Sequence, residues 1–177
     1  MHIVAISGSL RANSTNTKLI RAAVALAPAD TTATLYAGLD ALPHFSPERD
    51  TDPPPVAVAS LRALLQTANA VLICTPEYAF GIPGALKNAL DWMVSSGSLN
   101  GKPVAAIAAS PLYSGGINAH ASLLLTLSAL GANVLEGVKL TIPAVNAKLN
   151  ADGAITDPGL TLSLRAMMKA LVQTATP

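Results

Sequence analysis

Cysteine, aromatic residues and charge are all scarce in this chain of 177 residues. The one cysteine, Cys74, excludes an intramolecular disulfide and a cysteine-rich metal site. The three histidines, His2, His44 and His120, are widely separated and lack the spacing of metal ligands, so no metal is expected. Only 12% of residues are charged and the net charge is +1, with no run of like charges. Neither a nucleic acid nor an anionic membrane is therefore indicated as a partner.

Long apolar runs and targeting signals are also missing. The apolar stretches are too short to span a bilayer, so we expect no membrane insertion. The N-terminal segment lacks the basic and long apolar regions of a signal peptide, which predicts a cytoplasmic location. Hydrophobic residues make up 51% of the chain. A surface so poor in charge favours an oligomer that covers part of it.

The apolar segments alternate between strand-like and helix-like patterns, and the length fits one domain spanning residues 1–177. Strands are expected at residues 2–7, 32–36, 70–74 and 103–110 and within 133–142, and helices near 17–27, 56–67, 84–95, 118–130 and 159–174. Such β/α repeats predict an α/β fold with a doubly wound parallel sheet and right-handed crossovers.

Polar side chains crowd the turn between the first strand and the first helix. Its hydroxyl, amide and guanidinium groups come from Ser9, Arg11, Ser14, Thr15 and Asn16. Unpaired N–H groups at a helix N-terminus attract anions, and these side chains can add further donors. The turn therefore predicts a phosphate site. The alternative is simple N-capping of the helix by Ser14 or Asn16.

A second loop, residues 75–83, follows the buried strand at 70–74. The carboxyl ends of parallel strands are where open α/β sheets bind ligands. Tyr78 and Phe80 beside Gly81 offer flat apolar surface and an adaptable backbone, which would fit a planar heterocycle. The alternative is an ordinary strand–turn–helix connection with two packed aromatic residues.

Three ordered motifs resemble the family of NADPH-dependent FMN reductases. The family's GSxRxxSxN loop is matched by residues 8–16, its PEYN-x-x-x-PGxLKNALDW segment by residues 76–92, and its Gly-Gly loop by residues 114–116. The resemblance runs from the N-terminus to about residue 142. This chain departs from the pattern at Ala79, where Asn is usual, at Gly81, where Ser is frequent, and at Asn118, where many relatives have Arg.

The resemblance implies a flavodoxin-like fold with helices on both faces of a five-stranded sheet of order 2-1-3-4-5. It implies bound FMN and NAD(P)H as co-substrate. The flavin would carry the chemistry, so no catalytic side chain is expected. Hydride would pass through the flavin N5 by a ping-pong mechanism to quinones, azo compounds, metal oxyanions or free flavin. The implied cofactor-binding residues are Ser9, Arg11, Ser14, Thr15, Asn16, Pro76, Glu77, Tyr78, Ala79, Phe80, Gly81, Ser110, Ser114, Gly115 and Gly116.

Two other classes of function stay open at this point: a non-enzymatic electron carrier of flavodoxin type, and a binding module without cofactor. A homodimer or homotetramer is expected through helix 84–95. Five apolar residues of that segment exceed what one buried helix face requires: Leu86, Ala89, Leu90, Trp92 and Met93. The alternative is that Trp92 packs in the core of the monomer.

Overall fold

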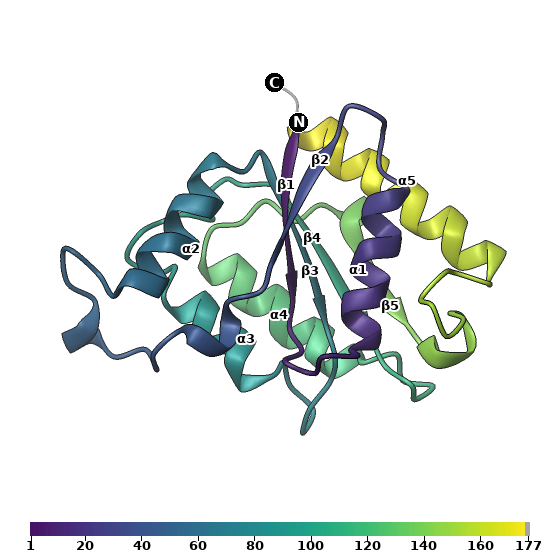
Figure 1. Ribbon diagram of the computed structural model, residues 1–177, viewed down its shortest axis with the longest axis horizontal. Helices are drawn as coiled ribbons and strands as arrows, with labels where there is room; N and C mark the ends of the chain where they lie inside the picture. The colour runs from purple at the N-terminus through teal and green to yellow at the C-terminus, as the bar shows by residue number, and fades with distance from the viewer. Residues whose placement is uncertain (176–177) are drawn as a thin grey trace.

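A five-stranded parallel sheet forms the centre of the protein, as the computed structural model of residues 1–175 shows (Figure 1). The strands are β1 (His2–Ser7), β2 (Thr32–Tyr36), β3 (Ala70–Thr75), β4 (Val104–Ala109) and β5 (Lys139–Ile142). Their order in the sheet is β2-β1-β3-β4-β5, and each neighbouring pair is parallel. The predicted flavodoxin-like fold is confirmed.

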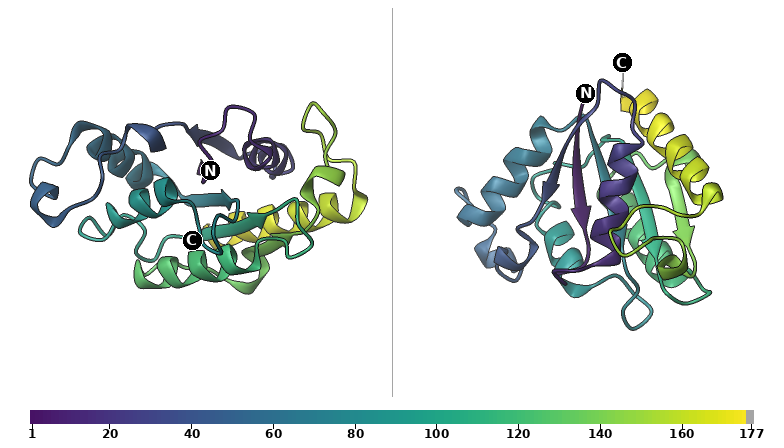
Figure 2. Two further views of the ribbon diagram at one scale, coloured as in Figure 1. Left: turned by 90° about the horizontal axis from the view of Figure 1, so that it is seen from below. Right: turned by 45° about the vertical axis from the view of Figure 1, so that its right-hand side comes forward.

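Helices cover both faces of the sheet (Figure 2). They are α1 (Thr15–Ala25), α2 (Val56–Thr67), α3 (Gly84–Asp91), α4 (Ile117–Ala129) and α5 (Pro158–Ala175). One core lies under α1 and α5, and a second core lies under α2, α3 and α4. Short 3-10 helices occupy Leu39–Ala41, Pro47–Arg49, Glu136–Val138 and Val145–Ala147.

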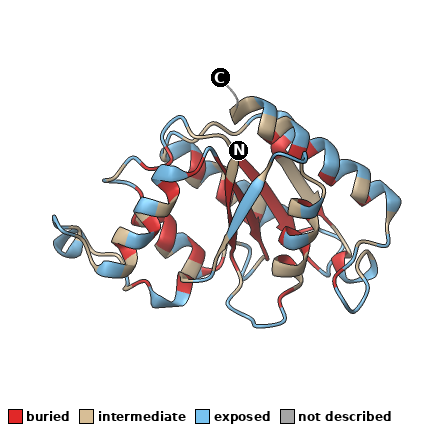
Figure 3. Cartoon of the chain, turned by 45° about the horizontal axis from the view of Figure 1, so that its top comes forward, coloured by how far each residue is buried: buried red, intermediate tan, exposed pale blue. Residues whose placement is uncertain are grey.

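Side-chain alternation in the strands supplies both cores. In β1, Val4 and Ile6 point into the core beneath α2, whereas Ile3 and Ala5 point toward α1 and α5. Every residue of β3 and β4 is buried, because helices cover both of their faces. The edge strand β2 is half exposed, and the contrast with the buried central strands is visible in Figure 3.

The strand order creates a switch point between β1 and β3. The chain leaves β1 toward α1 on one face, and it leaves β3 toward α3 on the other face. Loops that leave these neighbouring strands therefore diverge and open a crevice at their carboxyl ends. These ends lie at the bottom of Figure 1, where the loops after β1, β3 and β4 gather.

Helix α3 is shorter than the sequence predicts. It ends at Asp91 instead of continuing to residue 95. The carbonyl of Trp92 accepts hydrogen bonds from Arg62 Nε at 3.1 Å and Nη2 at 2.6 Å, and Arg62 also pairs with Asp50 at 2.9 Å. The Arg62 guanidinium thus occupies a carbonyl that a backbone N–H would use if the helix continued. The chain runs on through turns past residue 100.

The apolar residues proposed for a subunit contact through helix 84–95 are instead buried inside the subunit. The exposed fractions are 0% for Leu86, 3% for Ala89, 2% for Leu90, 0% for Trp92 and 1% for Met93. These five side chains therefore cannot form a subunit contact, contrary to the sequence prediction. A homodimer or homotetramer stays a prediction, and its contacts would have to come from other residues.

Trp92 packs in the core of the monomer, which is the alternative to a subunit contact that the sequence left open. Its indole Nε1–H donates to the carbonyl oxygen of Pro43 at 2.8 Å. Its ring meets Phe45 edge-on, with centroids 5.1 Å apart and planes at 87°. Trp92 therefore fastens the long loop after β2 to the core. Among residues 1–175, no helix is long and apolar enough to cross a membrane.

Candidate functional site

A cavity of about 290 Å³ lies at the carboxyl ends of β1, β3 and β4. It is lined by Ser9, Arg11, Ser14, Thr15, Asn16, Pro76, Glu77, Tyr78, Ala109, Ser110, Pro111, Leu112, Val145 and Asn146. All five predicted phosphate-loop residues are among them, together with members of both other predicted loops. The structure thus brings the motifs at residues 8–16 and 76–92 together with Ser110 in one place.

The phosphate loop presents open donors to this cavity. Helix α1 begins at Thr15, and its first intrahelical bond runs from Lys18 N–H to the Ser14 carbonyl at 3.0 Å. The N–H groups of the first turn therefore lack partners within the helix. Ser14 occupies the N-cap position and is 3% exposed, but its side chain makes no capping bond. The alternative of simple N-capping is not what the structure shows.

Arg11 lies at the open side of the same loop. Its carbonyl accepts the Ser14 N–H at 3.1 Å, and its own N–H donates to Ser9 Oγ at 3.3 Å. Within residues 1–175 the ion pairs involve Arg62, Lys87 and Lys139, so Arg11 has no carboxylate partner there. Its guanidinium is available to an anion in the cavity.

Asn16 is oriented by the one cysteine of the chain. The Cys74 thiol donates to Asn16 Oδ1 at 3.1 Å, and both residues are buried. Burial raises the pKa of the Cys74 thiol far above its usual value, so the sulfur keeps its proton and remains a donor. With Oδ1 engaged, the amide nitrogen of Asn16 can donate to a ligand.

The loop after β3 folds back as a tight turn. Tyr78 N–H donates to the Gly81 carbonyl and Gly81 N–H to the Tyr78 carbonyl, both at 2.9 Å. The two central residues have positive φ angles, 49° for Ala79 and 60° for Phe80, as in a type I′ turn. Ala79, Phe80 and Gly81 therefore project beyond the cavity, and only Pro76, Glu77 and Tyr78 of the predicted ring-binding set line it.

The Glu77 side chain joins two of the site's loops. Its Oε2 accepts the backbone N–H of Ala119 at 2.9 Å, in the first turn of α4. A carboxylate at a helix N-terminus satisfies an open donor and interacts favourably with the helix dipole. Glu77 thus caps α4 from another segment of the chain and holds the loop after β3 against the loop after β4.

In the loop after β4, glycines shape the backbone and the serine lines the cavity. Ser110 Oγ accepts the Leu112 N–H at 3.1 Å. Gly115 and Gly116 have φ angles of 65° and 79°, and a Cβ atom on Gly115 would lie 3.1 Å from the nitrogen of Pro143. The predicted residues 114–116 do not line the cavity. They turn the chain toward α4, where Glu77 caps it.

Sequence reasoning missed the segment after β5. Val145 N–H donates to the Ser110 carbonyl at 3.1 Å, and Thr15 Oγ1 donates to Asn146 Oδ1 at 3.3 Å. These contacts place Asn146 beside Thr15 of the phosphate loop and Val145 beside Ser110, and both residues line the cavity. The one signal in the sequence was topological, since the carboxyl end of a fifth parallel strand lies at the same edge of the sheet. Ala109 was also missed.

A rim of exposed apolar side chains surrounds the opening. Phe80 is 79% exposed and Tyr113 is 94% exposed, and Leu10, Tyr78 and Leu112 are each at least half exposed. These side chains come from the loops after β1, β3 and β4. Among residues 1–175, no group of three potential metal ligands is present. The donors at one end and the flat apolar surfaces at the other fit a phosphorylated planar ligand.

The chain belongs to the family of NADPH-dependent FMN reductases, whose family model matches residues 1–147. It is therefore an oxidoreductase of flavodoxin-like fold that works with FMN and NAD(P)H. The donor-rich phosphate loop and the neighbouring Tyr78 are in keeping with this cofactor.

Curated relatives and a solved structure agree with this assignment. The chain is 30% identical to an NAD(P)H-dependent FMN reductase of Pseudomonas aeruginosa over 171 residues, covering 96% of this chain and 92% of that protein. It is 32% identical to a 2-hydroxy-1,4-benzoquinone reductase of Burkholderia sp. over 171 residues, or 95% of this chain and 92% of that protein. The flavoenzyme FerB of Paracoccus denitrificans, an NAD(P)H:(acceptor) oxidoreductase, superimposes with a TM-score of 0.87 at 31% identity, covering 98% and 96% of the two chains.

Proposed function

We propose that the cavity at the carboxyl ends of β1, β3 and β4 binds FMN, with the phosphate at the N-terminus of α1. The observation that supports this most directly is the set of donors there: the free first-turn N–H groups, the uncapped Ser14 and the unpaired Arg11. Ser9, Thr15 and Asn16 complete the phosphate end. The backbone and side chains of residues 76–78 and Ser110 would hold the ring system.

FMN held in this cavity would supply the redox chemistry between NAD(P)H and a second substrate, with N5 of the flavin as the site of hydride transfer. The chain's own residues bind and orient the reactants. Ser14, Asn16 and the α1 N-terminus fix the phosphate, while Tyr78 and the turn at residues 78–81 limit one side of the site. Because no side chain is assigned a proton-transfer step, we expect no single residue to be indispensable for the chemical step.

We infer that the acceptor is a small planar or anionic oxidant, such as a quinone, azo compound, metal oxyanion or free flavin. The name of the Burkholderia relative, a benzoquinone reductase, supports a quinone as acceptor. The exposed aromatic rim of Phe80 and Tyr113 would stack on a planar molecule. A single opening would serve both NAD(P)H and the acceptor, so they would bind in turn by a ping-pong mechanism.

Replacement of Arg11 tests the cofactor site. A charge-assisted contact is worth about 1.5–3 kcal/mol, so Arg11→Ala should weaken FMN binding roughly 10- to 100-fold. The apoprotein would be titrated with FMN by flavin fluorescence, with Arg49→Ala as control, because Arg49 lies in the remote 3-10 helix Pro47–Arg49. Equal affinities for the Arg11→Ala variant and the unmodified protein would contradict the phosphate assignment.

Initial-rate kinetics tests the order of the reaction. Rates measured against NADPH at several fixed quinone concentrations should give parallel double-reciprocal lines. Intersecting lines would show that both substrates bind together. An electron carrier or a cofactor-free module would consume no NADPH under these conditions, and the family assignment favours the reductase over both. The cytoplasmic location and the homo-oligomer stay predictions.

A further inference from the structure

A second cavity, of about 240 Å³, lies beside the phosphate loop near the carboxyl ends of β1 and β2. It is separate from the proposed FMN cavity but shares Ser9 and Arg11 with it. The shared residues mean that the two cavities adjoin through one loop. The basic side chains that line the second cavity are Arg11 from this loop and Arg21 from α1.

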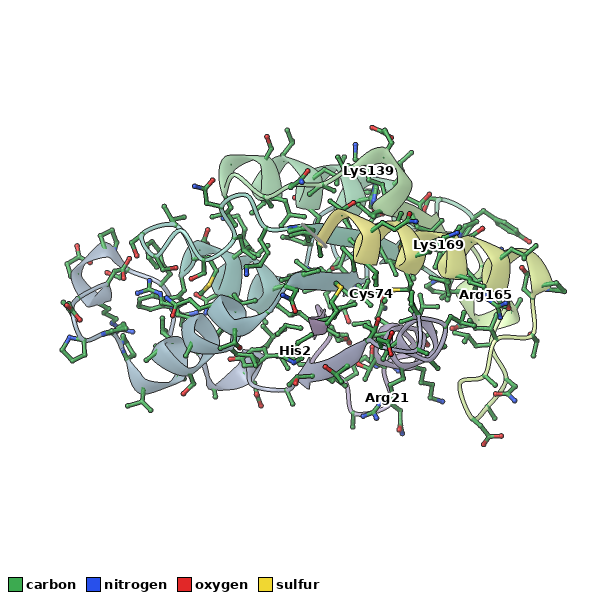
Figure 4. All side chains as sticks on the ribbon, turned by 90° about the horizontal axis from the view of Figure 1, so that it is seen from above. His2, Arg21, Cys74, Lys139, Arg165 and Lys169 are labelled. Atoms are coloured by element: carbon green, nitrogen blue, oxygen red, sulfur yellow. The ribbon has the colours of Figure 1, made fainter. Side chains whose placement is uncertain are left out.

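Neither arginine is neutralised by a carboxylate within residues 1–175, and Arg21 is left to bind an anion when the FMN phosphate engages Arg11. The ion pairs within residues 1–175 are Arg62–Asp50, Lys87–Asp91 and Lys139–Glu136, so neither Arg11 nor Arg21 has a carboxylate at pairing distance there. Arg21 follows Thr17 by one helical turn, which places both side chains on the face of α1 that lines the cavity. Figure 4 shows Arg21 at the margin of the molecule beside α1, where a soluble ligand can reach it.

The rest of the lining fits a nucleoside. Leu35 and Leu39 provide apolar walls for a base. The Tyr36 hydroxyl is protonated at neutral pH and can donate a hydrogen bond, and burial, together with the nearby charge of Asp40, raises its pKa further. The Asp40 carboxylate can accept hydrogen bonds from sugar hydroxyl or base amino groups. Guanidinium, hydroxyl, carboxylate and aliphatic groups in one cavity are the complement of a phosphorylated nucleoside.

The volume indicates that only part of a ligand enters. Ligand cavities usually measure about 300–1,000 Å³, so a cavity of this size would hold one end of a longer molecule. The other end would reach past Arg11 toward the FMN cavity. NADPH has this form, with the nicotinamide at one end and an adenosine bearing a 2′-phosphate at the other. The 2′-phosphate is also the group by which NADPH differs from NADH.

We propose that this second cavity binds the adenosine end of NADPH and that Arg21 contacts its 2′-phosphate. The inference rests on the proposed reductase function, and it adds a residue that decides between the two nicotinamide substrates. Arg21 is exposed, so its contact with the phosphate lies at the weaker end of charge-assisted hydrogen bonds. Its loss should therefore cost about tenfold in affinity for NADPH and leave NADH unaffected.

The kinetic test compares both substrates in the FMN-loaded enzyme. Arg21→Ala should raise the KM for NADPH about tenfold, with the KM for NADH unchanged, and Arg21→Lys should recover part of the loss. Arg165→Ala is the matched control, because Arg165 is an exposed arginine on α5 that does not line this cavity. Equal changes for NADPH and NADH, or no change for either, would overturn the proposal.

Calorimetry with fragments separates this inference from the reductase function. The FMN-loaded protein should bind 2′-AMP more tightly than adenosine, and Arg21→Ala should remove that difference. Binding of 2′-AMP that is the same in both proteins would overturn the role of Arg21, even if the enzyme oxidises NADPH. An enzyme that consumes neither NADPH nor NADH would contradict the proposed function, while the 2′-AMP titration would still decide whether Arg21 binds a phosphate.

Discussion

Removal of the Glu77 carboxylate should loosen two loops of the FMN cavity at once. Glu77 Oε2 accepts the Ala119 N–H at 2.9 Å, and Glu77 also lines the cavity. Loss of a capping acceptor costs about 1 kcal/mol, and loss of a carboxylate at a helix N-terminus costs about 0.3–1 kcal/mol more. Glu77→Ala should therefore lower the free energy of unfolding by roughly 1.3–2 kcal/mol. Glu77→Gln, which keeps an acceptor but loses the charge, should cost about 0.5 kcal/mol.

The same change should weaken FMN binding. Without the cap, the loops after β3 and β4 are no longer held together, so FMN must order them when it binds. We expect about tenfold weaker binding in Glu77→Ala, equivalent to about 1.4 kcal/mol. Urea unfolding of the apoprotein would measure the stability, and fluorescence titration with FMN in the absence of urea would measure the affinity.

Asp157 offers a matched control for Glu77. Its Oδ1 accepts the Leu160 N–H at 2.6 Å and so caps α5, away from the FMN cavity. Asp157→Ala should lose about 1 kcal/mol of stability without a change in FMN affinity. A Glu77→Ala protein as stable as the unmodified one would refute the cap. An equal loss of FMN affinity in Asp157→Ala would show that lower stability alone weakens binding.

Three further substitutions or treatments test other parts of the structure. Ala79→Gly should raise the free energy of unfolding by about 0.5–1 kcal/mol, because Ala79 has a positive φ angle of 49°, and a lower urea midpoint would contradict this. Trp92→Ala should lower it by about 3–5 kcal/mol, since the indole is buried, and a mild loss would argue against its place in the core. Cys74 should react with a thiol reagent at pH 8 only after unfolding in urea, because burial raises the pKa of its thiol, whereas rapid reaction in the native protein would show that the strand opens.

The fold could be predicted from sequence because its elements carry strong local signals. The bounds of β2 and α2 agree with the sequence prediction at both ends, and those of β1 do so as well. Continuous apolar runs identified β3 and β4, since both of their faces are buried. Helix α1 begins two residues earlier than expected, so Thr15 and Asn16 belong to its first turn and not to the preceding loop.

The features that were missed depend on contacts between distant segments. Nothing local to Glu77 indicates that its carboxylate caps α4, 42 residues further along the chain. The position of Asn146 in the cavity likewise depends on a bond to Thr15, 131 residues away. For Trp92, the helical pattern showed an apolar side but could not show that the loop containing Pro43 and Phe45 would cover it.

The charges around the cavity favour a reductase over an electron carrier. Arg11 and Glu77 are the charged residues that line it. The N-terminus of α4 offsets the charge of Glu77, whereas Arg11 has no carboxylate partner within residues 1–175. Charges a few ångströms apart interact by about 4 kcal/mol at an effective dielectric constant near 20. The unpaired positive charge of Arg11 would therefore favour a ligand that gains negative charge. We therefore expect the cavity to stabilise FMN that has received two electrons, as hydride transfer from NAD(P)H requires.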